Sequence, residues 1–282
     1  MTLSSNQLEA FSWLAKSGHF TLAAKRIGVT QSALSQRISK LEDELETTLF
    51  IRDRAGVQLT ESGLELLRYC QAKESLEAEF VGRLRSGAND QLAGKIRICG
   101  YSSVIHSVIL PALENCLREN PNVQMILASK EISEISSQLQ RGEADFILLD
   151  YRLERESVIS HRIGEEKLVL VERTKGNIAN RFLDHDEADE TTIRYLKHAK
   201  FKGAVERHYL DDIPGVIAGV ELGLGRAVLP LHMIRDSKSL RAIRPEVYLS
   251  SPVYLHYYER PYYSKLQQRV SRDLMSRSSE YL

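Results

Sequence analysis

Residues 30 to 45 read TQSALSQRISKLEDEL, and the two sides of this stretch differ in character. Leucine and isoleucine recur at helical spacing, which at about 100° per residue places them on one stripe of a helix. This apolar stripe consists of Leu34, Ile38, Leu41 and Leu45. The side chains opposite it are those of Ser32, Ser35, Gln36 and Ser39. A solvated helix face usually carries long charged residues of higher helix propensity, so this face is suited to close approach to another surface.

Two shorter helices are predicted before this stretch. Residues 5 to 17 carry apolar side chains in a mostly helical pattern, and Gly18 is a C-terminal stop signal. In TLAAKRIGV, Thr21 can cap a short helix that ends at Gly28. Its inward-facing residues would be Leu22, Ala23 and Ile27. With Thr30 as the N-cap of the third helix, two short helices joined by a tight turn predict a helix-turn-helix.

The residues after this unit predict a wing and a long helix. ETTLFIRDRAGVQLT has the pattern of a strand-turn-strand whose tip carries Arg52 and Arg54. A long helical stretch then runs from Glu61 to about Arg85, with apolar residues among many charges. A helix of this length has no domain of its own to cover, so we expect a partner helix to bury it. Residues 86 to 90 resemble a hinge.

From Gly94 the pattern changes to alternating strands and helices. KIRICG, NVQMILAS and ADFILLD are short apolar strands separated by helical segments, and EEKLVLVERT and PVYLHYYE are later strands. Such alternation predicts an α/β unit with a mostly parallel sheet. Residues 176 to 200 are polar and poorly patterned.

Composition narrows the range of functions. A chain of 282 residues is long enough for about two domains. The formal net charge is zero, so any binding to nucleic acid must come from a local arrangement of basic groups. Cys70, Cys99 and Cys116 show no metal or disulfide spacing, and we expect them to be reduced and mostly buried. We predict no metal site and no cofactor.

The sequence leaves two other functional classes to compare, an enzyme and a solute-binding protein. In GYSSVIH, Ser102, Ser103 and His106 lie close together, but no GxSxG, HExxH, Walker or GxGxxG motif is present. We therefore expect no catalytic residues and no enzyme. The second alternative is a solute-binding protein, since the carboxyl-terminal region of the chain looks like one. The amino-terminal residues show no export signal, and no stretch approaches the roughly 18 apolar residues of a membrane span, so we expect a cytoplasmic protein.

The motifs in FTLAAKRIGVTQSALSQRISKLEDELETTLFIRDRAGVQLTESG make the chain similar to a known family. The order and spacing of AA, TQ, SALS, LE, LF and LT..G resemble the amino-terminal region of LysR-type transcriptional regulators. GKIRICG, ILPAL, RGEADFILLD and GLGRAVLP resemble the family's effector-binding region more weakly. The resemblance implies a winged helix-turn-helix, a long dimerising linker helix, and an α/β regulatory region of periplasmic-binding-protein type with the ligand between two subdomains.

The boundaries implied are 1–60 for DNA binding, 61–90 for the linker helix and hinge, and 91–282 for the regulatory region. Within the latter, subdomain I would comprise about 91–166 and 251–282, and subdomain II about 167–250. Such a regulator would bind a double-stranded DNA operator and a small-molecule effector, associate as a dimer or tetramer, and contact RNA polymerase.

Candidate DNA contacts follow from the helical wheel and the wing. Glutamine and serine can hydrogen-bond to base edges, whereas arginine reaches phosphate. The candidate residues are Thr21, Gln31, Ser32, Ser35, Gln36, Arg37, Ser39, Arg52 and Arg54. A solvated helix face, ordinary surface arginines and simple capping by Thr21 are the alternative explanations.

Candidate effector contacts follow from the ends of the strands. Sheets of this class place ligands at the carboxyl ends of their strands, where Ser102, Ser103 and Ser129 could hold an anionic group. Arg207, His208 and Arg226 are candidate cationic partners from the second subdomain. Helix capping explains the serines about equally well. For Cys99 beside this site, a buried structural thiol is favoured over a sensor.

Overall fold

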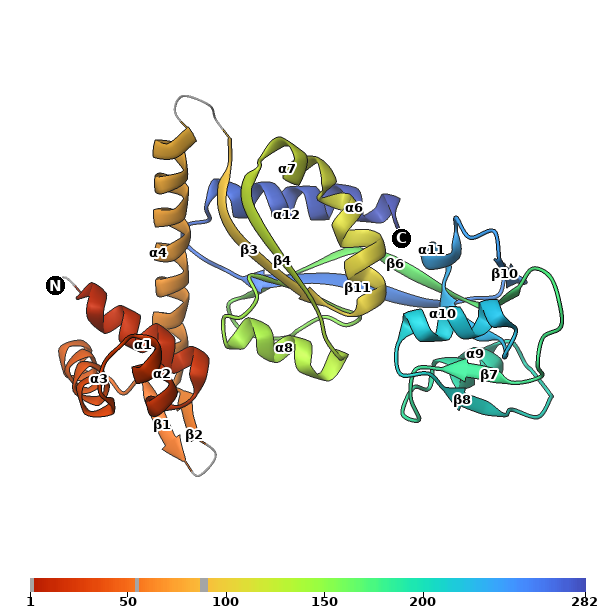
Figure 1. The fold of residues 1–282 in the computed structure, drawn as a ribbon, viewed down its shortest axis with the longest axis horizontal. Helices are drawn as coiled ribbons and strands as arrows, with labels where there is room; N and C mark the ends of the chain where they lie inside the picture. The colour runs from red at the N-terminus through yellow and green to blue at the C-terminus, as the bar shows by residue number, and fades with distance from the viewer. Residues whose placement is uncertain (1–2, 54–55, 87–90) are drawn as a thin grey trace.

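The computed structural model describes residues 3–53, 56–86 and 91–282. The amino-terminal unit, here called the head, contains α1 (Ser5–Ser17), α2 (Phe20–Arg26), α3 (Gln31–Leu45), β1 (Phe50–Asp53) and β2 (Gly56–Leu59). Gly18 has a φ of +67°, as a left-handed helix stop requires, and Thr30 Oγ1 caps α3 by accepting from the N–H of Ala33 at 3.2 Å. The predicted helix-turn-helix and its antiparallel wing are both present (Figure 1).

The head is held together by the predicted stripe of α3. Leu34, Ile38 and Leu41 are at most 1% exposed and pack with Phe11 and Leu14 of α1. Burying side chains of this size contributes about 1.5 to 3 kcal/mol each relative to leaving them in water. The opposite face of α3 is therefore left at the surface.

Two details of α2 differ from the sequence prediction. The helix begins at Phe20 with His19 as its N-cap, so Thr21 lies inside the first turn and does not cap it. Leu22 is 57% exposed and does not face inward. Only Ala23 and Ala24 of α2 are buried, because the small side chains allow the helix to approach its neighbours closely.

The long helix α4 (Glu61–Ser86) has two different parts. Leu66 and Leu67 near its start belong to the core of the head, so the expectation that the helix has nothing of its own to cover is wrong for this part. Further along, large apolar side chains are at the surface: Tyr69, Leu76, Phe80, Val81 and Leu84. The exposed part is the one that a partner helix could bury.

Helix α4 also contacts the regulatory region of its own chain. It stands beside β3 in Figure 1. Gln71 Oε1 accepts a hydrogen bond of 2.8 Å from Arg260, and Glu74 lies 3.6 Å from Arg97. Gly142 approaches the same helix so closely that a Cβ there would lie 1.6 Å from Nε2 of Gln71. These polar contacts tie the linker helix to the unit that follows it.

The regulatory region is built on one sheet of seven strands. Its order is β10-β6-β11-β5-β3-β4, with β9 also paired to β6. The strands are β3 (Ala93–Gly100), β4 (Asn122–Ser129), β5 (Phe146–Leu149), β6 (Val158–Arg173), β9 (Ala227–Pro230), β10 (Leu240–Ile243) and β11 (Leu249–Tyr258). Among the described strands of this sheet, the parallel pairs are β3 with β4 and β3 with β5. The prediction of a mostly parallel sheet is therefore wrong, because β11 pairs antiparallel with both β5 and β6.

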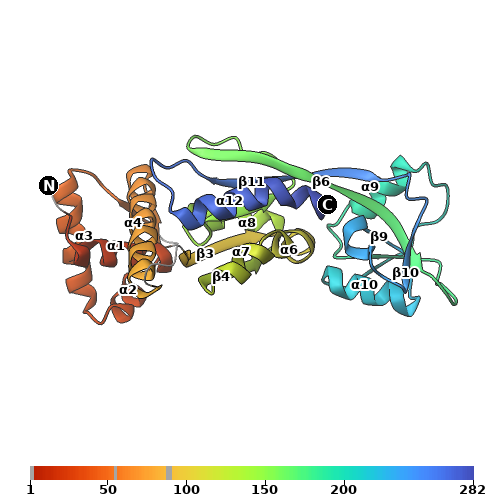
Figure 2. The ribbon, with the colours of Figure 1, turned by 90° about the horizontal axis from the view of Figure 1, so that it is seen from above.

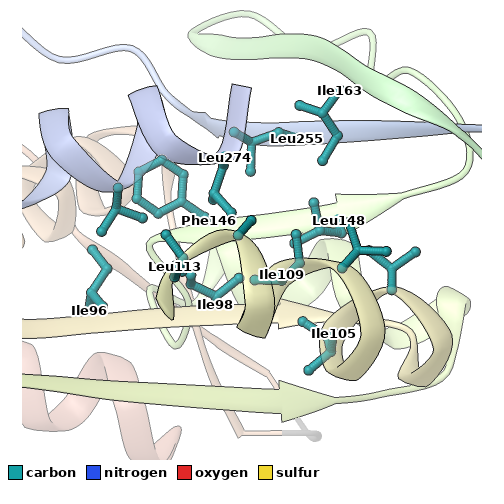
Figure 3. Packing of buried hydrophobic residues seen from close by; sticks show 14 of the residues in the cluster. Ile96, Ile98, Ile105, Ile109, Leu113, Phe146, Leu148, Ile163, Leu255 and Leu274 are labelled. Atoms are coloured by element: carbon teal, nitrogen blue, oxygen red, sulfur yellow. The ribbon is translucent and has the colours of Figure 1, made fainter. Parts of the chain in front are cut away.

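The long strands β6 and β11 run through two lobes (Figure 2). The first lobe adds α5 (Ser102–Val104), a π-helical turn (Ile105–Ile109), α6 (Leu110–Ala112), α7 (Glu114–Glu119), α8 (Ile132–Gln140), α12 (Lys265–Arg277) and a 3-10 turn (Ser278–Glu280). Its core joins Ile98 of β3, Phe146 of β5 and Leu255 of β11 to Ile109 and Leu274 (Figure 3). Helix α8 packs on the opposite face of the same sheet through Ile135 and Leu139, so helices cover both faces.

The second lobe adds β7 (Phe182–Asp184), α9 (Thr191–His198), β8 (Arg207–Tyr209), α10 (Ile213–Leu222) and α11 (Leu231–Ile234). Its core surrounds Val169 and Val171 of β6, which pack with Val220 and Leu229. Residues 176–200, which lack a clear sequence pattern, thus contain a parallel strand and a helix. Among the described residues, no helix has the length and apolar character needed to cross a membrane.

Candidate functional site

The outer face of α3 forms the first candidate site. Gln31, Ser32, Gln36 and Ser39 are exposed, and Ser35 is partly exposed. Thr21 joins this face from α2, since its Oγ1 donates to Oε1 of Gln31 at 3.4 Å. Arg37 is half-buried and lies off the face. The face is therefore a strip of short hydrogen-bonding groups on a well-packed helix.

The wing lies next to α3 and holds the second group of candidate DNA contacts. Arg52 lies on β1, opposite Val57 of β2. The predicted wing residue Arg54 falls outside the described residues. Between α3 and the wing, Glu42 Oε1 accepts from the N–H groups of Leu49 at 2.7 Å and Phe50 at 3.2 Å. This carboxylate fixes the start of the wing relative to α3.

The second candidate site lies where the lobes meet, at the end of β3. Gly100 is the residue opposite Ser129 at the end of β4, as the sequence predicts. Ser102 begins α5 and is partly exposed. Ser103 is buried, and its Oγ donates to Oε1 of Glu166 at 2.9 Å. The hydroxyl of Ser103 is therefore already engaged by a carboxylate of the chain.

The three cationic candidates of the second lobe are paired within that lobe. Arg207 donates to the carboxylate of Asp184, and this partner raises the pKa of Arg207 against the opposing effect of burial. Arg226 Nε lies 3.0 Å from Glu172. His208 Nε2 lies 3.1 Å from Arg181 and 3.3 Å from Glu206. Within the described part of the chain, none of the three forms a hydrogen bond or ion pair with the first lobe.

The junction instead contains residues that sequence reasoning missed. His232 of α11 lies with Nε2 2.8 Å from Glu166 Oε1 and with Nδ1 2.8 Å from Ser107 Oγ. The side chains of His232 and Glu166 are 2% and 4% exposed. Ser107 is also close enough to the carbonyl oxygen of Ser103 to donate to it. Its single hydroxyl hydrogen can serve only one of these two acceptors, so the orientation of the Ser107 hydroxyl depends on which ring nitrogen of His232 carries hydrogen.

This network is not the serine-histidine cluster considered from the sequence. His106 is exposed, whereas Ser103 is buried and bonded to Glu166. Ser107 does contact a histidine, His232. Its hydroxyl lies on a helical turn, within hydrogen-bonding distance of that ring and of the carbonyl oxygen of Ser103. The arrangement connects three elements: the helical segment of the first lobe, strand β6, and α11 of the second lobe.

Two further polar groups lie beside Glu166. Burial, with the nearby carboxylates of Glu166 and Asp150, raises the pKa of Tyr101 well above its usual value. The Tyr101 hydroxyl is buried and lies close enough to the Glu166 carboxylate to interact with it. Burial also raises the pKa of Asp150, Glu166 adds to this effect, and Arg194 opposes it.

Other contacts cross the junction at its margins. His185 Nε2 lies 3.6 Å from Oε1 of Glu131, which directly precedes α8. Arg235, just after α11, donates to the carbonyl oxygen of Leu282 at 3.1 Å. The two lobes are thus joined by polar contacts as well as by β6 and β11.

Metal binding and thiol chemistry have little support. No group of three or more histidine, cysteine or acidic residues within the described ranges could hold a metal ion. The three cysteines are free, and Cys99 and Cys116 are buried. Burial raises the pKa of Cys99 to about 11, which disfavours the reactive thiolate. This agrees with the structural role expected for Cys99.

Two family models match this chain. One is described as "Bacterial regulatory helix-turn-helix protein, lysR family" and matches residues 5–64. The other is described as "LysR substrate binding domain" and matches residues 89–275. Together they cover most of the chain, including both candidate sites.

Known proteins of this kind are similar over most of their length. An uncharacterized HTH-type transcriptional regulator, YusT of Bacillus subtilis, is 28% identical over 251 residues, which are 86% of this chain and 84% of the relative. The HTH-type transcriptional activator IlvY of Haemophilus influenzae is 26% identical over 251 residues, covering 82% and 84%.

Solved structures share the fold. Full-length LysG of Corynebacterium glutamicum with bound effector Arg matches with a TM-score of 0.71 and 16% identity, covering 98% of each chain. DarR of Vibrio fischeri in complex with DNA matches with a TM-score of 0.54 and 21% identity, covering 98% of this chain and 99% of that one. At these identities the similarity concerns the fold alone.

Proposed function

The chain belongs to the LysR family and is a DNA-binding transcription regulator with an effector-binding domain, and from this premise we propose how it reads DNA and senses its effector. In our proposal the outer face of α3 enters the major groove of a double-stranded operator. Gln31, Ser32, Ser35, Gln36 and Ser39 would address base edges there. Thr21, Arg37 and the wing residues Arg52 and Arg54 would contact the phosphate backbone.

One observation carries the DNA-reading part of this proposal. The strip of short polar groups on α3 is exposed while the opposite side of the same helix is fully buried, so the helix is rigid and its polar face is available. A rigid helix with glutamine and serine at its surface has the dimensions of a major-groove reader. The fold is also similar to that of DarR, which was solved in complex with DNA.

The effector is proposed to bind where the two lobes meet. Buried polar groups from β6, α11 and the first-lobe helix converge there, and a few convergent polar groups are one feature of small-molecule sites. We propose Ser102 and Ser129 as contacts and Ser103 as the residue that orients Glu166. Arg207, His208 and Arg226 would then maintain the second lobe. LysG, which has a similar fold, was solved with its effector Arg.

We propose the division of labour that the sequence predicted. Residues 1–60 would bind DNA, 61–90 would join two chains, and 91–282 would sense the effector. The exposed apolar side chains of α4 support a homodimer, from which a tetramer could form. Contact with RNA polymerase and a cytoplasmic location belong to the same proposal. The family consists of transcription regulators, which are not enzymes.

Selection of genomic DNA tests the proposal directly. The full-length chain is incubated with fragments of bacterial genomic DNA at physiological salt, and the retained fragments are sequenced. We expect a small set of fragments with a shared, roughly palindromic motif. The Gln36→Ala variant should select a different or broader set. Retention of all fragments equally would overturn sequence-specific reading.

A further inference from the structure

We propose that Glu42 is a positioning residue for DNA binding: it sets where the wing meets the DNA relative to α3, without touching the DNA itself. This inference rests on the proposed contacts of α3 and of the wing residue Arg52 with DNA, and it adds a residue outside both groups of contacts. Glu42 lies near the end of α3, on the same helix as the proposed base-reading side chains.

One carboxylate oxygen of Glu42 receives two hydrogen bonds from the start of the wing. Its Oε1 accepts from the N–H of Leu49 at 2.7 Å and from the N–H of Phe50 at 3.2 Å. The N–H groups of successive residues in an extended strand point to opposite sides, so the chain has to turn here for one atom to bind both. Leu49 and Phe50 are buried, so without Glu42 these two donors would lose their partner away from water.

Arg52 follows this attachment by two residues on β1. A strand rises about 3.4 Å per residue, so the backbone of Arg52 lies about 7 Å beyond that of Phe50. A rotation of about 25° at Phe50 would therefore move Arg52 by about 3 Å, which is enough to break a hydrogen bond to a phosphate. The hydrogen bonds of Glu42 thus control the position of Arg52 relative to the recognition helix.

Two other anchors attach the wing to different elements of the head. The N–H of Val57 on β2 donates to the carbonyl oxygen of Gly18, in the turn after α1, at 3.1 Å. Thr60 Oγ1, directly before α4, donates to the carbonyl oxygen of Thr48 at 2.7 Å. Neither anchor involves α3. We therefore expect both to keep the wing folded when Glu42 is replaced, while the direction of the wing relative to α3 becomes less defined.

The sign of the expected effect distinguishes positioning from charge. A carboxylate near DNA is repelled by the phosphates, so removal of an acidic side chain from the head should by itself strengthen DNA binding. The positioning role predicts the opposite result for Glu42, because the wing contact is lost although a negative charge is removed. Asp43 is the next residue and is exposed, so Asp43→Ala is the matched control for the charge.

The experiment is a double-mutant cycle measured on DNA affinity. The full-length chain, Arg52→Ala, Glu42→Met and the double variant are titrated by fluorescence anisotropy against a mixed-sequence duplex and against the genomic fragment retained most strongly in the selection. Methionine keeps the length and helix propensity of glutamate but has no oxygen atom to accept from the wing.

The cycle should show strong coupling between Glu42 and Arg52. Arg52→Ala should weaken binding of the native protein about threefold to tenfold on both DNAs, but that of Glu42→Met by less than about twofold. Glu42→Met alone should weaken binding about threefold to tenfold, because it misplaces the same arginine. Asp43→Ala should not weaken binding.

Two conservative variants test the geometry of the contact. Glu42→Gln keeps an oxygen atom at the same reach, so we expect its DNA affinity to stay within about twofold of the native value. Glu42→Asp keeps the acid but sets it back by one methylene, about 1.5 Å, and should behave like Glu42→Met. The aspartate variant decides the test if Glu42→Met unfolds the head at the temperature of the assay.

Equal effects of Arg52→Ala in the native protein and in Glu42→Met would overturn the positioning role and leave the phosphate contact of Arg52 in place. The role is also overturned if Glu42→Gln binds as weakly as Glu42→Met, or if Glu42→Met and Glu42→Asp both unfold the head, since Glu42 would then act through charge or folding alone. If Arg52→Ala has no effect in the native protein, the proposed wing contact fails and this inference fails with it. Selection of operator DNA still decides the proposed reading by α3.

Discussion

Ser107 and His232 come from different lobes, and Oγ of Ser107 lies 2.8 Å from Nδ1 of His232. The other ring nitrogen of His232 lies 2.8 Å from Glu166 on strand β6. Both nitrogens of a nearly buried imidazole are therefore satisfied by residues outside its own helix. Since Glu166 also receives a hydrogen bond from Ser103, a change at any of these residues leaves another buried polar group without its partner.

Replacement of His232 should destabilise the junction. In His232→Ala the buried Glu166 carboxylate loses a donor and Ser107 loses a partner, so we expect the free energy of unfolding to fall by about 1 to 3 kcal/mol. Urea unfolding at pH 7 measures this. His198→Ala, which removes an exposed histidine of the same lobe, should change stability by no more than about 0.5 kcal/mol. Equal losses in the two variants would contradict a special role for His232.

Stability should decline at mildly acidic pH because of His256. This residue is fully buried, with Nδ1 2.8 Å from Ser160 Oγ and Nε2 3.1 Å from the carbonyl oxygen of Tyr151. Burial lowers its pKa from 6.5 to about 4, so the unfolded chain binds a proton that the folded chain does not. Its contribution is complete above pH 6.5 and is lost as the pH falls toward 4.

The size of this effect can be isolated by mutation. Between pH 6.5 and 5 the loss amounts to about 2 kcal/mol, since each pH unit corresponds to about 1.4 kcal/mol. Urea unfolding at pH 7.5 and at pH 5 measures how far the free energy of unfolding falls between these two pH values. This fall should be about 2 kcal/mol smaller in His256→Gln than in the native protein. The exposed His106 is the control, and His106→Gln should keep the native pH dependence.

The head could be predicted from the sequence because its determinants are local. The stripe of α3, the cap at Thr30 and the stop at Gly18 each lie within one or two turns of the structure that they specify. The sequence predicts Thr21 as the cap of α2, but several residues near a helix start can serve as caps, and the backbone enters this helix at His19. The small polar face of α3 needed no tertiary information.

The lobe junction could not be predicted because its partners are distant in sequence. His232 is 66 residues from Glu166 and 125 from Ser107, and no spacing rule connects them. Glu166 lies in the strand pattern EEKLVLVER, where a carboxylate at a buried position gives a weak signal at most. The mixed sheet could not be predicted for the same reason. The alternation of strands and helices along the chain indicates how successive elements connect, but it does not indicate the antiparallel pairing of β6 with β11.

Variants in the head should separate base recognition from backbone contact. Gln36→Ala removes an exposed amide from α3, and we expect a loss of about 1 to 3 kcal/mol on the specific operator with little change on random DNA. Arg52→Ala should weaken both and lower the slope of log affinity against log salt by about 1. Fluorescence anisotropy at several salt concentrations measures both quantities. Equal loss on both DNAs for both variants would refute the distinction.

Self-association should depend on the far part of α4. Phe80 and Leu84 are 56% and 69% exposed, so Phe80→Glu with Leu84→Glu should produce monomers in sedimentation experiments without lowering the melting temperature of the head. Leu67→Glu is a contrasting variant, because Leu67 is 2% exposed in the head's core and its replacement should unfold the head. Leu22→Glu, at another exposed leucine, is the control that should leave the assembly unchanged.

The contact between α4 and the first lobe should be weakened by a single methyl group at Gly142. This residue has a φ of +65°, and a Cβ there would lie 1.6 Å from Nε2 of Gln71. Oε1 of Gln71 accepts a hydrogen bond from the half-buried Arg260. Gly142→Ala should therefore displace Gln71 and deprive Arg260 of its partner. We expect faster hydrogen exchange in α4 around Gln71 and a loss of about 1 to 3 kcal/mol in stability.

Gly28 provides the matched control for this variant, because its φ is +70° but nothing lies within 4 Å of its added Cβ. Gly28→Ala has the same backbone strain, of about 1 kcal/mol, without displacing a neighbour. Faster exchange in α4 for Gly142→Ala alone would establish that Gln71 and Arg260 hold the linker helix to the sensing region. Equal acceleration in both variants would attribute the effect to strain, and no acceleration in either would mean that other contacts, such as the ion pair of Arg97 with Glu74, hold the helix in place.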